Sequence, residues 1–264
     1  MDPVAFKIGF IAIRWYGVMA AAGFIAGVLI ALKNRKFAGM SADQIYNMML
    51  VAMLAGVGGA RLFYVVQYWE EFQGRFWEIF RVDHGGLVFY GGFICAMVAL
   101  AIYCRRQKLD LLTVLSLLGP SLTLGHMFGR IGCFLNGCCF GHPTELPWGF
   151  TYPAGSDPDK CFHGMSLHPV QIYEAVGNLI LFFILQYLLP KSRGGQIAGL
   201  YMVLYGLMRM IDEFFRGDYE QHYLGLFTPA QLLCFLVIPL GIAVIIWSGR
   251  RYRKNDTADN IINS

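Results

Sequence analysis

The sequence predicts an all-α protein that crosses a membrane several times. Hydrophobic residues make up 56% of its 264 residues and charged residues only 14%, whereas soluble domains carry about 25% charged residues. The mean hydropathy is +0.51, and the apolar residues form continuous stretches near the roughly 20 residues that a membrane-spanning helix needs. This pattern excludes a disordered chain, a nucleic-acid-binding tail, an ordinary soluble enzyme and the alternating strands of a membrane β-barrel.

Seven apolar segments have the length of a transmembrane helix. They cover residues 15–32, 47–68, 85–104, 111–128, 172–189, 197–211 and 229–247. We find no internal repeat and no second domain, so we expect one integral membrane domain over residues 1–264, with a polar C-terminal tail at 250–264.

The basic residues predict the orientation of these segments. Twelve of the 21 Lys and Arg residues follow the odd-numbered segments: Lys33, Arg35, Lys36, Arg105, Arg106, Lys108, Lys191, Arg193, Arg250, Arg251, Arg253 and Lys254. Because basic loops stay in the cytoplasm, we expect the N-terminus outside and the C-terminus in the cytoplasm. The long connection at 129–171 then faces outward. It is rich in Gly, Pro, Asp and Cys, which predicts a loop with short helices, and connections of this length are usually functional or disordered.

Three arginines lie within or beside the apolar segments on their predicted outward side. Arg61 falls in the second segment, Arg130 just after the fourth and Arg209 in the sixth. An ionisable residue is costly inside a membrane and is therefore a candidate for function. The guanidinium fork suits phosphate, so three convergent arginines favour an anionic ligand such as a phospholipid headgroup. The alternatives are snorkelling to the interface and pairing with a structural carboxylate.

Two carboxylates accompany these arginines. Glu213 lies four residues after Arg209, on the same helix face, where it either orients Arg209 as an ion pair or contacts a ligand. Glu174 opens the fifth segment after a polar stretch that begins at His168. A helix-capping arrangement and a contact with a ligand explain Glu174 equally well.

Two groups of glycines indicate local structure, one a close approach of helices and the other an irregular backbone. Gly56, Gly58 and Gly59 lie in the second segment, where small residues allow close helix approach. The glycine pairs at 85–86 and 91–92 instead predict non-helical backbone beside a cavity.

Three of the seven cysteines crowd together: Cys133, Cys138 and Cys139, with His142 nearby. Their spacing is not the usual paired spacing of structural zinc sites. A metal site, a disulfide that includes Cys161 as a possible partner, and a nucleophilic thiol all stay open from these residues alone.

Several of these residues belong to longer motifs. The motifs are RWYG at 14–17, GGLVFYGG at 85–92, GRIGCFLNG at 129–137, LHPVQIYE at 167–174 and YGLMRMIDEFFRGD at 205–218. In their order and spacing the chain resembles the prolipoprotein diacylglyceryl transferases, and the resemblance covers nearly the whole chain.

The resemblance implies an enzyme of the bacterial inner membrane whose active site faces the periplasmic side. Its substrates would be phosphatidylglycerol and prolipoprotein signal peptides with a lipobox cysteine, both reached from the bilayer. The diacylglyceryl group would pass to the cysteine thiol as a thioether while glycerol phosphate leaves. No metal, organic cofactor or nucleic acid is expected to take part.

The resemblance also assigns residues. Arg130 matches the family's phosphatidylglycerol-binding arginine and Arg209 its second essential arginine. Arg61 is a further candidate for substrate binding on the strength of its position in a span. Other polar positions of the family fall on Tyr16, Asn136, Tyr205, Glu213 and His168.

The chain departs from the family pattern at three positions. Tyr90 stands where many members have a His that is a candidate base, Cys133 where many have Asn, and Cys138 where many have Glu. Tyrosine ionises near pH 10 and needs a positive field to act as a base at neutral pH, so Tyr90 is a candidate and His84 is the alternative. The competing function is a small-anion transporter or channel that uses the same arginines, although such proteins usually contain repeats.

Overall fold

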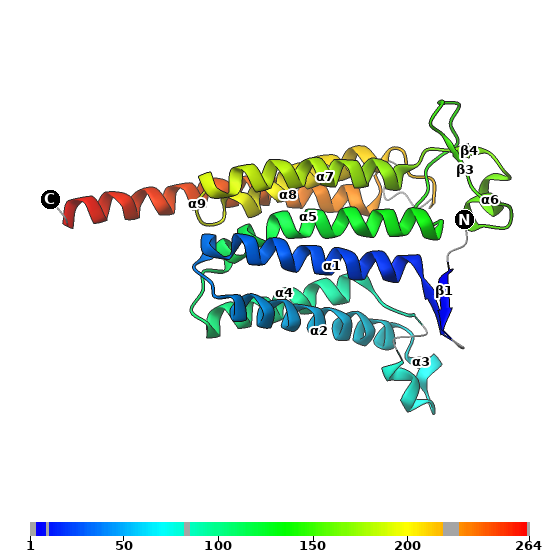
Figure 1. Ribbon diagram of the computed structural model, residues 1–264, viewed down its shortest axis with the longest axis horizontal. Helices are drawn as coiled ribbons and strands as arrows, with labels where there is room; N and C mark the ends of the chain where they lie inside the picture. Colours follow the sequence, from blue (N-terminus) through cyan, green and yellow to red (C-terminus); the bar gives the residue numbers. More distant parts are fainter. Residues whose placement is uncertain (1–3, 9–10, 82–84, 219–226, 263–264) are drawn as a thin grey trace. The chain divides into compact units, whose positions relative to one another are not determined.

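The computed structural model of the chain describes residues 4–8, 11–81, 85–218 and 227–262 (Figure 1). These residues form two compact units. The large unit comprises Met1–Asn34 and Leu115–Ser264, and the small unit comprises Arg35–Val114. The expected single membrane domain stays a prediction.

The structure is mostly helical, which confirms the predicted fold class. Two short antiparallel pairs of strands accompany the helices, β1 (Val4–Ile8) with β2 (Ile11–Arg14) and β3 (Phe150–Thr151) with β4 (Ser166–Leu167). The long helices are α1 (Trp15–Asn34), α2 (Ala42–Gln67), α4 (Phe89–Arg106), α5 (Leu111–Asn136), α7 (Val170–Leu188), α8 (Gln196–Glu213) and α9 (Pro229–Ile262). The short ones are α3 (Trp69–Phe72), α6 (Asp157–Phe162) and the 3-10 turns η1 (Arg35–Ala38), η2 (Phe76–Phe80) and η4 (Leu189–Lys191).

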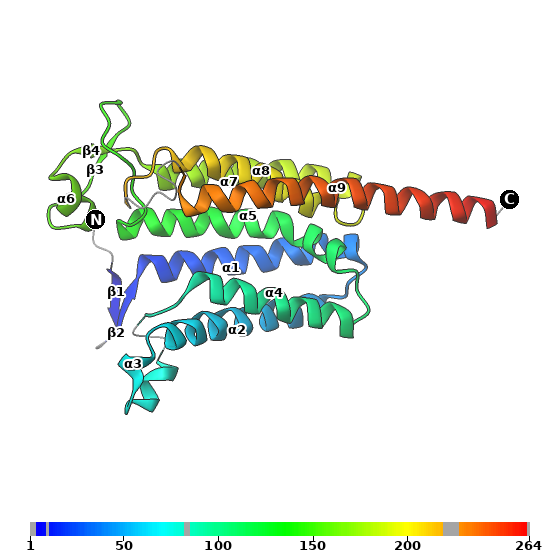
Figure 2. The same ribbon diagram turned by 180° about the vertical axis from the view of Figure 1, so that it is seen from behind.

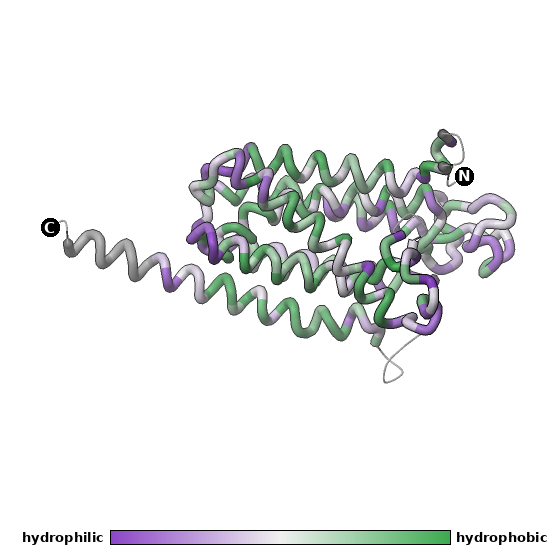
Figure 3. The backbone as a smooth tube through the Cα atoms, turned by 90° about the horizontal axis from the view of Figure 1, so that it is seen from below, coloured by the Kyte–Doolittle hydropathy of each residue, from purple (hydrophilic) through white to green (hydrophobic). Residues whose placement is uncertain are grey.

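Within the described residues, six helices are long and apolar enough to cross a membrane: α1, α2, α4, α5, α7 and α9. Hydrophobic residues cover most of the length of these helices, and hydrophilic residues gather near their ends (Figure 3). The chain is therefore a multi-pass helical membrane protein. The remaining predicted segment forms α8, whose last turns carry Arg209, Asp212 and Glu213, so α8 lacks the uniformly apolar composition of the others.

Helix α5 continues two turns beyond the predicted boundary at 128 and ends at Asn136. The first part of the predicted loop 129–171 is thus helical, and this corrects the sequence analysis. Gly132 makes the extension compatible with packing against α1. A Cβ at this position would lie 3.1 Å from the Cβ of Met19 and 3.3 Å from the Cα of Tyr16, so glycine is what lets the two helices approach.

Two other boundaries differ from the prediction. Helix α4 begins at Phe89 and not at position 85, because Gly85 and Gly86 have φ angles of +81° and +71°, which no right-handed helix contains. Helix α9 runs to Ile262 through most of the predicted polar tail. The tail opens with Arg250 and Arg251, and arginine is a good helix former once the preceding span has nucleated the helix.

In the large unit α1, α5, α7, α8 and α9 run side by side, as both views show (Figures 1 and 2). Helices α8 and α9 approach most closely at a pair of glycines. A Cβ at Gly199 would lie 2.6 Å from the carbonyl oxygen of Gly241, and a Cβ at Gly241 would lie 2.7 Å from that of Gly199. Such contacts between small residues replace the hydrophobic effect as the source of helix packing in lipid.

In the small unit α2 packs on α4 through the predicted glycines. A Cβ at Gly92 would lie 2.8 Å from the carbonyl oxygen of Gly56, and a Cβ at Gly59 would lie 2.8 Å from that of Gly91. This confirms the packing role for Gly56 and Gly59, whereas Gly58 faces open space. The glycine pair at 91–92 is therefore helical and serves helix packing, which corrects the expectation of irregular backbone there.

Candidate functional site

Two arginines and two glutamates from three helices form a cluster inside the large unit. The Nε of Arg130 on α5 lies 2.7 Å from Oε2 of Glu174 on α7. From α8, Arg209 places Nη1 3.0 Å from Oε1 of the same Glu174 and Nη2 2.6 Å from Oε2 of Glu213. We call these four residues the arginine–carboxylate cluster. Glu174 is its centre, because it binds both arginines.

The cluster is closed on its acidic side and partly open on its basic side. The side chain of Glu174 is 1% exposed, whereas those of Arg130 and Arg209 are 16% and 13% exposed. The ion pair of Arg130 is made through Nε, and its guanidinium group also forms a hydrogen bond with the side chain of Tyr205. The two cations are thus held in place by buried carboxylates and can present hydrogen-bond donors to an anion.

A third carboxylate lies beside the cluster. Asp212 on α8 is buried, and its Oδ2 has no hydrogen-bond partner among the described residues. Leaving such an oxygen without a partner is costly in a buried site. Among the described residues, the site therefore retains unused hydrogen-bonding capacity on Asp212.

One face of α7 carries the polar residues that support the cluster. Gln171, Glu174 and Asn178 are all buried and lie at helical spacing. Asn178 donates from Nδ2 to the backbone oxygen of Glu174 at 2.8 Å. Gln171 donates from Nε2 to the backbone oxygen of Cys138 at 2.7 Å, which ties α7 to the segment that follows α5.

The sequence analysis did not assign the bridging role of Glu174 or the supporting roles of Gln171 and Asn178. The signal was present, since three polar residues at positions i, i+3 and i+7 share one helix face. In an otherwise apolar helix, such a stripe indicates a buried polar partner on a neighbouring helix.

Aromatic rings flank the arginines. Tyr205, which precedes Arg209 by one turn of α8, stacks on His126 of α5 with ring centroids 5.1 Å apart. It also stacks on Tyr201 at 5.5 Å. His126 precedes Arg130 by one turn, so Tyr205 and His126 form an adjoining layer of the cluster.

The segment 137–143 connects the motifs at 129–137, 167–174 and 205–218, which lie far apart in sequence. Gly141 donates its backbone N–H to His168 at 3.1 Å, and His142 donates to Phe215 at 2.9 Å. Gly217 donates to Phe140 at 3.0 Å. Backbone pairing thus fixes the ends of α5, α7 and α8 relative to one another, and these are the ends that carry the cluster.

His168 has a local structural partner in addition to this pairing. Its Nδ1 lies 3.2 Å from the hydroxyl of Tyr173, which also accepts a hydrogen bond from Trp148 Nε1 at 2.9 Å. Burial lowers the pKa of His168, and the neighbouring His142 lowers it further. At neutral pH His168 is therefore a neutral hydrogen-bonding group.

The three crowded cysteines gather where α5 ends. The Sγ atoms of Cys133, Cys138 and Cys139 all lie within 4.8 Å of one another. Hydrogen bonds from Cys133 and Cys138 lower the pKa of the Cys139 thiol, and the charges of Arg216 and Arg130 lower it further. Cys161 lies exposed on α6 and is not part of this group.

The structure places the other predicted residues as follows. Tyr16 lies at the start of α1 against Gly132, and Asn136 is the last residue of α5. Tyr90 belongs to the small unit, where its side chain is 55% exposed and its ring contacts Phe89 at 5.8 Å. His84 lies outside the described residues.

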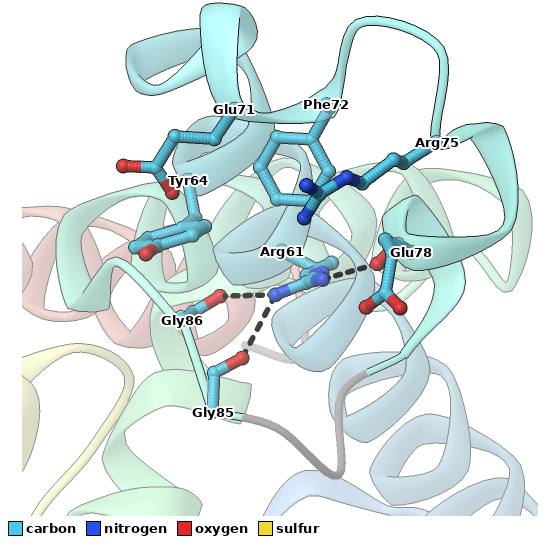
Figure 4. A pocket seen from close by; sticks show the side chains of 8 residues that line it. All are labelled: Arg61, Tyr64, Glu71, Phe72, Arg75, Glu78, Gly85 and Gly86. Carbon is cyan, nitrogen blue, oxygen red and sulfur yellow. Dashed lines mark hydrogen bonds between the residues drawn. The ribbon is translucent and has the colours of Figure 1, made fainter.

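Arg61 belongs to the small unit and binds backbone carbonyl groups (Figure 4). Its Nε donates to Ile79 at 2.9 Å, and its Nη1 donates to Gly85 at 2.8 Å and to Gly86 at 3.2 Å. Its Nη2 donates to the carbonyl of Glu78. All three arginines were expected to converge on one site. Arg130 and Arg209 meet within the large unit, Arg61 holds the segment that leads into α4 within the small unit, and the convergence of all three stays a prediction.

A cavity of about 190 Å³ lies beside Arg61. Its lining comprises Arg61, Tyr64, Glu71, Phe72, Arg75, Glu78, Gly85 and Gly86. The backbone at Gly85 and Gly86 is non-helical and borders this cavity, which confirms the prediction for that glycine pair.

The fold and the site together define a class, a multi-pass helical membrane protein with a buried pair of arginines around a shared glutamate. Residues 3–247 match the family described as prolipoprotein diacylglyceryl transferase. The chain belongs to this family, as its sequence motifs predicted.

Named relatives agree with this family. The chain is 33% identical to the phosphatidylglycerol–prolipoprotein diacylglyceryl transferase of Finegoldia magna, with 97% of this chain and 99% of the relative aligned. It is 35% identical to the enzyme of the same name from Clostridium tetani, with 96% and 100% aligned. An enzyme of that name from Clostridium botulinum strain Langeland is also 35% identical, with 93% and 96% aligned.

Proposed function

We propose that this protein transfers the diacylglyceryl group of phosphatidylglycerol to the lipobox cysteine of prolipoproteins. The observation that carries the proposal is the arrangement of Arg130 and Arg209 on one buried glutamate, in a chain of this family. The shared Glu174 holds both guanidinium groups together, and both arginine side chains stay partly exposed. A lipid phosphate is the anion that such a pair is suited to bind.

The two arginines suit the negative charge that develops during the transfer reaction. The acceptor sulfur attacks the glycerol carbon of the lipid, a C–S bond forms, and the C–O bond breaks with its electron pair leaving on the phosphate. Negative charge grows on the departing oxygen. Preorganised donors in a site of low water content stabilise that charge most effectively. We assign this role to Arg130 and Arg209, with Glu213 and Glu174 orienting them.

Other predicted residues have supporting roles in the proposal. Tyr16 at the start of α1, Asn136 at the end of α5, Tyr205 within α8 and His168 just before α7 contact substrate. Tyr90 is the candidate acceptor of the thiol proton. Arg61 is retained as a substrate-binding residue that acts through the backbone it holds. The acyl chains and the signal peptide reach the site laterally from the bilayer.

The membrane arrangement is also part of the proposal. We infer seven spans with α8 as the sixth, the N-terminus outside and the C-terminus in the cytoplasm of a bacterial inner membrane. The basic residues after the odd-numbered spans support this orientation. The active site then opens toward the periplasmic side, and the connection after α5 lies there with it.

The alternative of an anion transporter or channel is not favoured. The named relatives are transferases that cover nearly the whole chain, and the sequence shows no paired repeat of the kind that transporters often contain.

The proposal is tested with purified protein, phosphatidylglycerol vesicles and a synthetic lipobox peptide. The expected product is a thioether-linked diacylglyceryl peptide together with free glycerol phosphate, detected by mass spectrometry. A peptide whose lipobox Cys is replaced by Ser is the control for sulfur attack. Absence of product from protein that is folded and supplied with both substrates would refute the transferase function.

The orientation is tested by labelling single added cysteines with a membrane-impermeant thiol reagent in sealed cells. We use a background without cysteines, because Cys161 is exposed and Cys133, Cys138 and Cys139 are partly exposed. Glu145→Cys is expected to react from outside, and Lys36→Cys only after the membrane is opened. Labelling of Lys36→Cys from outside, and of Glu145→Cys only after the membrane is opened, would show that the orientation is the opposite of the one proposed.

A further inference from the structure

The end of α5 has a backbone geometry that brings two cysteine side chains together. Gly137 has a φ angle of +72°. Its N–H donates to the carbonyl of Phe134 at 3.2 Å, and the N–H of Cys138 donates to the carbonyl of Cys133 at 3.1 Å. This pair of bonds is the Schellman motif, in which the residue after the glycine packs its side chain on the residue five positions earlier. Cys133 and Cys138 are therefore placed in contact by the helix cap itself.

Cys139 joins them through an unfavourable backbone conformation. Its φ angle is +60°, in the left-handed region, where a non-glycine residue costs about 1–2 kcal/mol. Such strain persists only where the surroundings impose it, and it gathers at functional sites. Here it accompanies a Cys139 side chain whose sulfur lies with the other two, all within 4.8 Å.

The spacing of the three sulfurs suits one shared metal ion. Thiolates bound to a zinc ion at about 2.3 Å in tetrahedral geometry lie about 3.8 Å apart. The observed limit of 4.8 Å lies close to that value. A disulfide would use two of the sulfurs and would leave the position of the third unexplained.

The number of ligands indicates the type of site. Among the described residues, no fourth Cys, His, Asp or Glu joins the three cysteines within the same range. Structural zinc sites have four protein ligands, whereas sites with three protein ligands keep a position for water or substrate. The cysteines therefore form a site that is open to an external ligand.

We propose that Cys133, Cys138 and Cys139 bind one thiophilic cation such as Zn²⁺, and that the remaining coordination position takes the thiol of the acceptor cysteine. The second half of this inference rests on the proposed function, and the first half does not. Three soft ligands, of the kind that zinc and other thiophilic cations prefer, thus lie at one place.

Nearby charges are compatible with such a complex. Three thiolates and a divalent cation have a net charge of −1. Arg130 and Arg216 lie near enough for their charges to act on Cys139. Arg130 is paired with Glu174 and Arg216 with Asp218, so each guanidinium group lies beside the cysteines together with its own carboxylate, and Arg130 connects the complex to the proposed phosphate site.

A metal ion held at this place would promote deprotonation of the acceptor thiol. When the acceptor thiol replaces a bound water, its S–H bond breaks, its proton passes to solvent and its sulfur remains as a thiolate, because a coordinating thiol is deprotonated. That sulfur then forms the C–S bond as the phosphate leaves with the electron pair of the C–O bond. No oxidant or reductant is required. The thiol would lose its proton without depending on Tyr90 as a strong base.

The metal half of the proposal is tested by the stoichiometry of binding. The full-length protein is purified under reducing conditions, loaded with Zn²⁺ and freed of excess ion. We expect about one equivalent per chain, and less than about a tenth of that in Cys139→Asn, because a metal site fails when it loses one of three ligands. Asn tolerates the left-handed backbone, so this variant keeps the fold.

Two further variants make the result specific. Cys139→His restores a ligand at a position whose backbone His tolerates, and it should recover binding. Cys161→Ser is the matched control, since it removes a thiol from the same connection and should retain the full equivalent. Failure of the wild-type protein to bind Zn²⁺, or equal binding in Cys139→Asn, would overturn the metal site. Isolation of a disulfide among the three cysteines from metal-loaded protein would also overturn it.

The thiol half is tested with Co²⁺ as a spectroscopic probe. The visible spectrum of Co²⁺-loaded protein should change when the lipobox peptide is added and should stay unchanged with the Cys-to-Ser peptide. An unchanged spectrum with a peptide that is nevertheless converted to product would overturn thiol coordination while leaving the transferase function intact. A changed spectrum without any product in the transfer assay would instead contradict the transferase function.

Discussion

The two units hold their buried arginines in different ways. In the large unit Arg130 and Arg209 bind carboxylates, whereas in the small unit Arg61 binds backbone carbonyls of the segment 78–86. A carboxylate neutralises the arginine and fixes the direction of its side chain. The guanidinium N–H groups that the carboxylate does not bind can serve a ligand. Carbonyl groups bind the donors themselves and shape the backbone around the charge. The same residue type can therefore serve chemistry in one unit and architecture in the other.

The largest expected effect is that of Glu174→Gln, which removes the anion that both cluster arginines share. Breaking a buried ion pair from one side costs about 3–5 kcal/mol, because the remaining charge is uncompensated. We expect strong destabilisation in a thermal unfolding experiment in detergent and loss of transfer activity. Glu213→Gln is the control and should be milder, since in the described part of the chain Glu213 is paired with Arg209 alone. Equal losses would show that Glu174 is not the centre of the cluster.

Arg130→Lys and Arg209→Lys should reduce turnover by about a hundred- to thousandfold, or about 3–4 kcal/mol in the barrier. Lysine keeps the charge but lacks the planar fork that binds two oxygens. The measurement is the rate of thioether formation at saturating lipid in folded, membrane-inserted protein. Near-normal turnover of both variants would remove arginine-assisted phosphate departure from the mechanism.

Arg61→Lys should change turnover less, by under about tenfold, and should mainly lower stability. The ammonium group cannot reach the four carbonyls at once, and each lost bond to a charged donor costs about 1.5–3 kcal/mol. Thermal unfolding and turnover are measured on the same sample. An inactive Arg61→Lys with an unchanged melting temperature would move the anion site to the small unit and reverse the comparison.

The two glycines beside Arg61 give the finest comparison and the smallest expected effect on turnover. Gly85→Ala must adopt a positive φ angle, which costs about 1–2 kcal/mol. Gly86→Ala carries the same strain, and its Cβ would also lie 2.6 Å from Cε1 of Tyr64 and 2.8 Å from Nη1 of Arg61. We therefore expect Gly86→Ala to lower the melting temperature more than Gly85→Ala. The opposite order would mean that the Arg61 contact does not constrain this backbone.

The sequence could predict the helices and their approximate bounds, because apolar runs in a membrane protein have a length set by the bilayer. It could not predict that α5 extends to Asn136, since Gly129 and Gly132 are typical of loops when no packing partner is known. The packing of α1 on Gly132 decides that boundary, and it depends on residues more than a hundred positions away.

The members of the site were predictable, and so was the pairing of Arg209 with Glu213 on one helix, but the pairing of both arginines with Glu174 was not. Arg130, Arg209 and Glu213 could be identified from their cost in a membrane. Glu174 could be noticed but not assigned, because a carboxylate at a helix start is equally a cap. Its role follows from which helices are neighbours, and a single sequence does not contain that information. The sequence likewise did not indicate that Arg61 binds backbone carbonyls while Arg130 and Arg209 bind carboxylates, because all three arginines lie in or near apolar segments.

The sharing of Glu174 has a consequence for biogenesis. The chain leaves the ribosome from its N-terminus, so α5 and α7 are made before α8, and Glu174 can at first meet only Arg130. Its second arginine arrives with α8, and so does the strand-like segment near Arg216 that pairs with Gly141. Until then the inserted helices carry an incompletely paired set of buried groups, which disfavours a tightly closed bundle. Completion of α8 is therefore the event that completes the arginine pair, and α9 then packs on α8 at Gly199 and Gly241 to close the large unit.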